Sequence, residues 1–263
     1  MKRALTIAGS DSGGGAGIQA DLKTFGALGV YGASAITAVT AQNTVTVSRI
    51  QEIDPEVVAA QIEAVIEDIG FDAVKTGMLA STPIVEAVAS ALKRHRVVNL
   101  VIDPVMVSKT KACLLKADAI AALKSLLLPL AEIVTPNIPE AEVLSGHKVI
   151  DAETMRDAAR RIRDLGPKRV VIKGGHSEGP YVVDLYFDGE KFEELKAERV
   201  QTRATHGTGC TFSAAIAAYL AHGLPPLEAV ARAKEFLTAA LQAAPGIGKG
   251  IGPVNHFHAF HKA

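Results

Sequence analysis

A run of glycine and small hydroxyl residues leads into an apolar segment near the C-terminus. Residues 205–211 read Thr-His-Gly-Thr-Gly-Cys-Thr and precede the helix-forming segment 212–220. The first N–H groups of a helix have no partner inside the helix, and with the positive end of the helix dipole they bind anions. We therefore expect Gly207, Thr208 and Gly209 to bind a transferring phosphoryl group. The alternative is an ordinary glycine-rich helix start.

Cys210 is one residue of this turn that can take part in proton transfer. The helix dipole is expected to lower the pKa of its thiol, and a thiolate there could take the proton of an attacking hydroxyl. In the alternative, Cys210 packs as a small apolar side chain. The other cysteine, Cys113, has no partner motif and is expected to pack.

Polar residues also follow the ends of other predicted strands. Asp103 follows the apolar strand 97–102, where its charge would lie near phosphates or a metal. Lys173 ends the strand 169–173 and would serve as a point charge on phosphate, or else as a solvated strand end. Asn137 and Glu140 follow the strand 132–135 and suit Mg²⁺, although their spacing alone favours a helix N-cap.

A glycine cluster at 9–17 follows the first strand. It contains Gly15-x-Gly17-x-x-Ala20, which nominally matches a dinucleotide fingerprint. The loop is long for that turn, and Gln42 stands where a ribose-binding acid is expected. We therefore favour glycines that let the backbone approach a small ligand, over a plain turn or a dinucleotide site. The pattern Gly-x-x-x-x-Gly-Lys-Ser/Thr does not occur, so a P-loop nucleotide site is not expected.

The C-terminal histidines His256, His258 and His261 could in principle be metal ligands. They have no cysteine or acid at a suitable spacing, so we favour surface or packing histidines.

Strands and helices alternate along the chain and must position these residues. The expected strands are 4–8, 73–76, 97–102, 132–135 and 169–173, with hairpins at 34–53 and across 188–189. This order predicts an α/β fold in which helices cover both faces of a mostly parallel sheet. The polar strand ends should then share one edge of the sheet. We expect residues 1–263 to form one domain, in which 34–53 is a small lid or dimer surface.

Composition narrows the class of protein. The 263 residues are 48% hydrophobic with a formal net charge of +0. A large core is therefore possible, and there is no electrostatic footprint for nucleic acid or an anionic membrane. No apolar run reaches membrane-spanning length, and two cysteines fit a reducing compartment rather than a disulfide framework. We expect a cytoplasmic protein.

Several motifs together resemble the hydroxymethylpyrimidine/phosphomethylpyrimidine kinase family of thiamine biosynthesis, and they run in order through the whole chain. They are GSDSGGGAGIQADLKTF (9–25), TAQNT (40–44), KTGML (75–79), DPVM (103–106), TPN (135–137), KGGH (173–176), THGTGCT (205–211) and GPVNHF (252–257). The combination is specific, whereas the glycine motifs alone would not be.

The resemblance implies a ribokinase-like three-layer αβα sandwich, often a homodimer. It implies transfer of the γ-phosphate of ATP to 4-amino-5-hydroxymethyl-2-methylpyrimidine and then to the monophosphate. Many ribokinase relatives have Asp as the base where this chain has Cys210, which makes a sugar substrate less expected. A pyridoxine or pyridoxal kinase, or a non-catalytic pyrimidine sensor, is the alternative.

The resemblance also implies roles for single residues. Gln42 would hydrogen-bond the aminopyrimidine edge, because an amide offers both a donor and an acceptor. The remaining residues of the pyrimidine pocket would be Gly9, Ala16, Asp21, Met78 and Val105. Lys173, Thr208 and Gly209 would contact ATP phosphates, Cys210 would lie near the hydroxymethyl group, and Asp103 with Asn137 and Glu140 would act around Mg²⁺.

Overall fold

The computed structural model describes residues 1–106, 114–176 and 179–260. Within these ranges all strands join one sheet in the order β3-β2-β1-β4-β5-β6-β7-β8-β9. The strands are β1 (Arg3–Asp11), β2 (Tyr31–Gln42), β3 (Val47–Glu52), β4 (Ala73–Thr76), β5 (Leu100–Ile102), β6 (Ile133–Val134), β7 (Arg169–Ile172), β8 (Tyr181–Phe187) and β9 (Phe192–Glu198).

The centre of the sheet is parallel and its margins are antiparallel. Each neighbouring pair from β2 through β1, β4, β5 and β6 to β7 runs parallel. Antiparallel pairing adds β3 to β2 at one margin, and β8 and β9 beyond β7 at the other. The two expected hairpins and the mostly parallel sheet are therefore confirmed.

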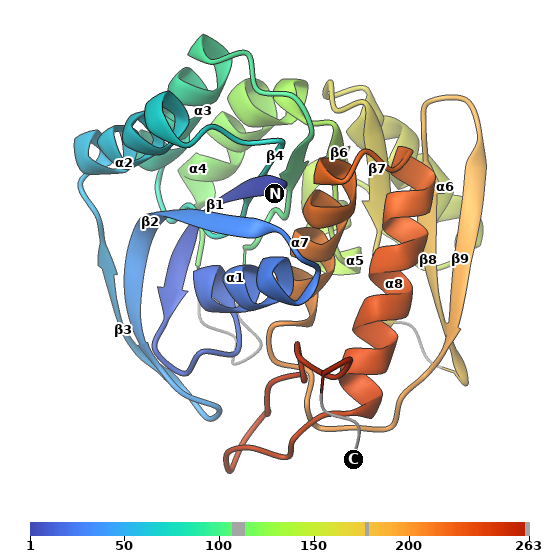
Figure 1. Ribbon diagram of the computed structural model, residues 1–263. Helices are drawn as coiled ribbons and strands as arrows, with labels where there is room; N and C mark the ends of the chain where they lie inside the picture. Colours follow the sequence, from blue (N-terminus) through green and yellow to red (C-terminus); the bar gives the residue numbers. More distant parts are fainter. Residues whose placement is uncertain (107–113, 177–178, 261–263) are drawn as a thin grey trace.

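Helices cover both faces of this sheet, which completes the three layers expected from the sequence (Figure 1). On one face α1, α7 and α8 pack side by side, and the other helices cover the opposite face. The helices are α1 (Gly17–Ala27), α2 (Pro55–Asp68), α3 (Thr82–Arg94), α4 (Ala117–Ala122), α5 (Ile138–Ser145), α6 (Ala152–Arg163), α7 (Thr208–Ala221) and α8 (Pro226–Gln242).

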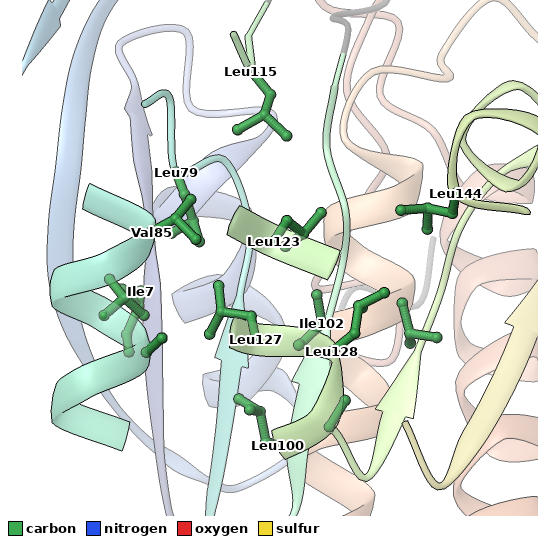
Figure 2. Close-up of a cluster of buried hydrophobic side chains, with 14 of the residues drawn as sticks. Ile7, Leu79, Val85, Leu100, Ile102, Leu115, Leu123, Leu127, Leu128 and Leu144 are labelled. Carbon is green, nitrogen blue, oxygen red and sulfur yellow. The ribbon is translucent and has the colours of Figure 1, made fainter. Parts of the chain in front are cut away.

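The core is divided into two clusters by the sheet, because successive strand residues point to opposite faces. In β5, Leu100 and Ile102 belong to the cluster under α2, α3 and α4, and Val101 between them belongs to the cluster under α1, α7 and α8. Figure 2 shows the first cluster, in which Leu123, Leu127 and Leu128 lie over Leu100 and Ile102.

α7 is the helix most enclosed by the rest of the protein. Ten of its residues are buried, five of them alanines, and it contacts α1, α8 and the strands β1, β4 and β5. Small side chains let the helix lie close to its neighbours on every side, so α7 is apolar all round rather than amphipathic. Its N-terminus is thereby held at a fixed place against the sheet.

Two segments differ from expectation. The helix expected over 118–127 begins as α4 and continues as one turn of π-helix, Leu123–Leu127, and a short 3₁₀ turn, Leu128–Leu130. The polar residues after β6 open a full helix, α5, which the sequence indicates only through its cap. Cys113 and His261 lie outside the described residues.

No helix among the described residues is both long enough and apolar enough to cross a membrane.

His256 makes the stability of the fold depend on pH. Burial lowers the pKa of this side chain to about 4 from its ordinary 6.5, and its Nε2 lies 3.0 Å from Oγ1 of Thr211. As the pH falls from 6.5 towards 4, His256 takes up a proton in the unfolded chain but stays neutral in the folded chain. Stability is therefore lost on acidification, by about 2 kcal/mol at pH 5.

The measurement is the free energy of unfolding in urea at pH 7 and pH 5 for the native chain and for His256→Gln. The variant should lose about 2 kcal/mol less between the two pH values. Equal losses in both proteins would contradict the assignment.

Candidate functional site

A cavity of about 710 Å³ opens at the carboxyl ends of the parallel strands. Residues at or just after the ends of β1, β4, β5, β6 and β7 line it, together with the first turn of α7. The strand-end residues that the sequence analysis singled out therefore meet at one edge, as the alternation of strands and helices predicts.

The first turn of α7 supplies the anion-binding geometry of the site. Gly207 is the N-cap with φ 74°, and no described side chain caps the helix. The N–H groups of Thr208, Gly209 and Cys210 are thus the free donors of a helix N-terminus, and all three residues line the cavity. A negatively charged group of a ligand is the partner that this end of α7 attracts.

Gly207 is also packed against the glycine loop that follows β1. A side chain on Gly207 would overlap the carbonyl oxygen of Gly15, and a side chain on Gly17 would overlap that of Gly9. These glycines bring two backbone segments into contact. At Gly17 and Gly207 the close approach is therefore one of backbone to backbone, and the expected approach of the glycine loop to a ligand stays a prediction.

Asp11 occupies the donors of the glycine loop itself. Its carboxylate accepts hydrogen bonds from the N–H groups of Gly13, Gly15 and Ala16 at 2.8–3.1 Å. An anion-binding loop whose donors are already taken by a carboxylate of the same chain has little room for a phosphate. This arrangement argues against the dinucleotide alternative for the loop, and the first turn of α7 stays the predicted anion site.

The Cys210 thiol does not behave as the helix dipole alone predicts. Burial raises the pKa of Cys210 to about 11, and the nearby Lys75 ammonium and the Gly17 N–H only partly oppose it. The expected lowering is therefore wrong: withdrawal from water outweighs the dipole. Cys210 lines the cavity, and its thiol is protonated at neutral pH.

Asp21 does not line the cavity, contrary to expectation. Its carboxylate is fully buried, accepts two bonds from Nζ of Lys75 at 2.8 and 3.1 Å, and accepts one from Thr6 Oγ1 at 2.6 Å. Although burial lowers the pKa of Lys75, Asp21 raises it further, so Lys75 stays charged. A fixed positive charge therefore stands between Asp21 and the cavity, with Lys75 itself at the cavity wall.

Asp103 and Lys173 form an ion pair beside α7. Lys173 Nζ donates to Asp103 Oδ1 at 2.8 Å, and both side chains come within 3.5 Å of the position that a Cβ on Gly209 would take. Burial lowers the pKa of Lys173, but Asp103 and Glu140 outweigh it and the pKa is raised. The Lys173 ammonium is thus held next to the first turn of α7.

Asn137 and Glu140 form a capping box at the start of α5. Glu140 N–H donates to Asn137 Oδ1 at 2.9 Å, and Asn137 N–H donates to Glu140 Oε2 at 2.8 Å. This is the helix N-cap that the spacing favoured. Burial also raises the pKa of Glu140 well above its usual range, and Lys173 only partly reverses the shift.

The remaining sequence candidates lie in the lining of the cavity. Gly9, Ala16, Gln42, Met78 and Val105 are all there, on β1, β2, the start of α1 and the loops after β4 and β5. Their predicted contact with a ligand stays a prediction.

Two groups of lining residues were not found from the sequence. One is an apolar wall made by Val182, Val200, Phe212, Leu237 and Leu241. These residues come from β8, the segment after β9, α7 and α8, so no local motif unites them. The other is the pair Asp11 and His206, in which Oδ2 and Nε2 lie 2.8 Å apart. Both residues stand in motifs that carry the family resemblance, but the sequence analysis gave neither of them a role.

The chain also matches a known protein family over most of its length. Residues 11–255 match the model of the phosphomethylpyrimidine kinase family. The chain belongs to this family. It is 52% identical over 262 residues to the hydroxymethylpyrimidine/phosphomethylpyrimidine kinase of Rhizobium meliloti, covering 98% of both chains.

A bifunctional relative and a solved structure complete the comparison. The thiamine biosynthesis bifunctional protein ThiED of Geobacter sulfurreducens is 54% identical over 96% of this chain, which spans 51% of that protein. The ADP complex of Bacillus subtilis pyridoxal kinase superimposes with a TM-score of 0.93 at 43% identity, over 100% of both chains. The expected ribokinase-like fold is confirmed by this likeness.

Gly207 and Gly223 offer a matched test of the contact between the two loops. Both have positive φ, but only Gly207 has backbone atoms where a Cβ would stand. Gly223→Ala should cost about 1 kcal/mol of stability for the left-handed backbone alone. Gly207→Ala should cost about 1–3 kcal/mol more, because Gly15 must move. Urea unfolding measures both; equal costs would contradict the close contact.

The buried ion pair is tested by Lys75→Met. The substitution leaves the Asp21 carboxylate buried without its cation, so stability should fall by about 3–5 kcal/mol. Lys148→Met removes the exposed partner of Glu142 and should cost less than about 1 kcal/mol. Chemical unfolding of the two variants compares them directly. A Lys75 variant no less stable than the Lys148 variant would show that the pair does not hold this part of the site together.

Proposed function

We propose that the protein phosphorylates 4-amino-5-hydroxymethyl-2-methylpyrimidine with ATP, and then phosphorylates the monophosphate to the diphosphate. The observation that carries the proposal is the free N-terminus of α7, which faces the same cavity as Gln42 and Cys210. A phosphoryl group bound by α7 would lie between a group that can recognise the acceptor and a thiol beside its hydroxyl. The membership of the kinase family and the relative from Rhizobium meliloti support the same reaction.

ATP would lie along the β7–α8 side of the cavity. The side chains of the apolar wall suit an aromatic base, which would pack against them. Lys173 lies beside the first turn of α7, with its Nζ 3.3 Å from the position that a Cβ on Gly209 would take, and there it would contact the phosphates. The ADP complex of the Bacillus subtilis pyridoxal kinase supports a nucleotide as one ligand of this fold.

The donor set near Lys173 fits Mg²⁺ in part. Within the ranges that the structure describes, no three His, Cys, Asp or Glu side chains cluster as a metal site. Mg²⁺ in kinases, however, commonly uses one or two carboxylates with substrate phosphates and water. Asp103 and Glu140 would hold the ion, and Asn137 fits least because its side-chain oxygen caps α5. The bound ion would neutralise phosphate charge.

Phosphoryl transfer here would depend mainly on position and charge. The acceptor oxygen forms the new bond to the γ-phosphorus as the bond to the leaving ADP oxygen breaks. The N–H groups at the start of α7 donate to the equatorial oxygens, where charge is greatest in the transition state. Lys173 offsets the negative charge of the donor phosphates.

The proton of the alcohol would pass to Cys210 in its thiolate form. With a pKa of about 11, only about one molecule in a thousand carries the thiolate at pH 8. The first transfer should therefore accelerate as the pH rises above neutrality. The second transfer has a phosphate oxygen as its nucleophile, which carries no hydroxyl proton that must be removed.

Pyridoxal or pyridoxine phosphorylation is a second candidate. The likeness to the Bacillus subtilis pyridoxal kinase at a TM-score of 0.93 favours testing it. Turnover of the pyrimidine and pyridine alcohols side by side decides between the two substrates. A pyrimidine sensor without activity would bind the alcohol and release no ADP.

The assembly and location of the protein belong to the same proposal. We take residues 1–263 as one domain, because all described strands join one sheet. A homodimer would form through the hairpin of β2 and β3, since β3 ends the sheet and leaves one edge open for pairing. Sedimentation of the full chain measures this state. The balanced charge and the two cysteines support a cytoplasmic enzyme.

Cys210→Ala tests the base directly. The variant should slow phosphorylation of the alcohol by about a hundredfold or more, within the range for a general base. Phosphorylation of the monophosphate should fall by less than about tenfold. The two products are separated and identified by mass after incubation with ATP and Mg²⁺.

Equal losses in the two steps would remove the base role of Cys210. Failure of the native chain to form either phosphate would remove the proposed function itself.

A further inference from the structure

His206 joins four segments around the cavity. Its N–H donates to the Gly252 carbonyl at 3.0 Å, and its ring leaves no room for a Cβ on Gly15. It directly precedes Gly207 in the anion-binding turn, and its Nε2 lies 3.4 Å from Nε2 of Gln42. Because His206 is buried and contacts both the turn and Gln42, it can fix the position of Gln42, the residue that would recognise the acceptor, relative to the turn.

The ring nitrogen Nε2 of His206 carries a hydrogen. It lies 2.8 Å from Asp11 Oδ2, and this carboxylate also accepts the loop N–H groups. Burial raises the pKa of Asp11, but His206 and these N–H groups outweigh it and hold the pKa below its usual value. A carboxylate accepts and does not donate, so the hydrogen between the two atoms belongs to the imidazole.

Gln42 lies between His206 and Thr40. Its Oε1 is 3.1 Å from Thr40 Oγ1, and Thr40 Oγ1 is 3.0 Å from the Ser10 carbonyl. With Nε2 of Gln42 towards His206, two N–H groups face each other. The single hydroxyl proton of Thr40 is then also shared between two acceptors.

The opposite amide orientation satisfies every group. The two ends of a carboxamide have the same shape, so their hydrogen-bond partners decide which end is which. With the oxygen towards His206, the imidazole N–H has Asp11 and Gln42 as acceptors. The Gln42 amino group then donates to Thr40 Oγ1, and the Thr40 hydroxyl donates to the Ser10 carbonyl.

We propose that the Asp11–His206 pair and Thr40 are positioning residues that fix the Gln42 amide with its oxygen towards His206 and its amino group towards Thr40. One lone pair of the oxygen and one N–H of the amino group then remain for a ligand in the cavity. They form an acceptor and a donor side by side, which matches the exocyclic amine and adjacent ring nitrogen of an aminopyrimidine. This inference rests on the proposed function, in which Gln42 reads that edge.

The arrangement makes the acceptor specificity depend on residues outside the phosphate site. An alcohol without the exocyclic amine would leave the Gln42 oxygen without a second partner. Sites built to bond a polar group discriminate strongly against an analogue that lacks it. Loss of either support would let the amide turn, and this discrimination would fall even though Gln42 is still present.

The test compares kcat/KM for 4-amino-5-hydroxymethyl-2-methylpyrimidine with that for 5-hydroxymethyl-2-methylpyrimidine, which lacks the amine. The native chain should favour the first by about a hundredfold. His206→Met removes the ring donor, and Thr40→Val removes the hydroxyl at the other end of the amide. Each should reduce the preference by about tenfold or more, with KM for ATP changed less than about twofold.

His206→Gln is the conservative variant, because its amide N–H can donate from nearly the same place as Nε2. It should keep most of the native preference. His256→Gln removes another buried histidine, which lies outside the cavity lining, and should keep all of it. Thermal unfolding of each variant establishes that the folded state is being measured.

Gln42→Ala distinguishes recognition of the amine by Gln42 from the positioning role of His206 and Thr40. If this variant keeps the native preference, Gln42 does not read the amine, and that part of the proposed function fails. If Gln42→Ala loses the preference while His206→Met and Thr40→Val both keep it, the positioning role is overturned. Loss in all three variants, with retention in His206→Gln, supports it.

Discussion

The close contact between Gly207 and Gly15 is the constraint on which the site depends. No side chain fits between these two backbones, so the glycine loop after β1 and the turn before α7 lie directly against each other. The contact brings the N-termini of α1 and α7 to the same place, where the Gly17 N–H bonds the Cys210 thiol. Buried alanines around α7 hold its free donors at the cavity.

Charge around the cavity is organised in opposed pairs. Asp21 faces Lys75, and Asp103 faces Lys173. A buried charge without a partner is costly, so each pair allows ionised groups to stay near the cavity before a ligand arrives. Lys75 and Lys173 therefore place positive charge at the cavity without further rearrangement of the chain. The thiol of Cys210 also lies near Lys75, but burial outweighs this charge and keeps the thiol protonated.

Much of the site was predictable because strand order decides where strand ends lie. Asp103, Asn137 and Lys173 were placed at one edge from the alternation of strands and helices alone, and all three line the cavity. Asp21 was misplaced because a helix residue next to a glycine motif can face the ligand or the core, and sequence spacing does not separate the two. The Cys210 pKa was misjudged for a related reason: the dipole is visible in the sequence, whereas the loss of water is not.

The sequence by itself determined the layers, the parallel centre of the sheet and the family, since these follow from hydrophobic periodicity and from motifs that are continuous along the chain. It also predicted an anion site at the turn 205–211, because free N–H groups at a helix start need no distant partner. Only the tertiary structure decided which donors stay free. Asp11 fills the glycine loop, the first turn of α7 stays open, and His206 reaches Gln42 across 164 positions of the chain. Such contacts depend on the packing of distant segments, for which no local pattern exists.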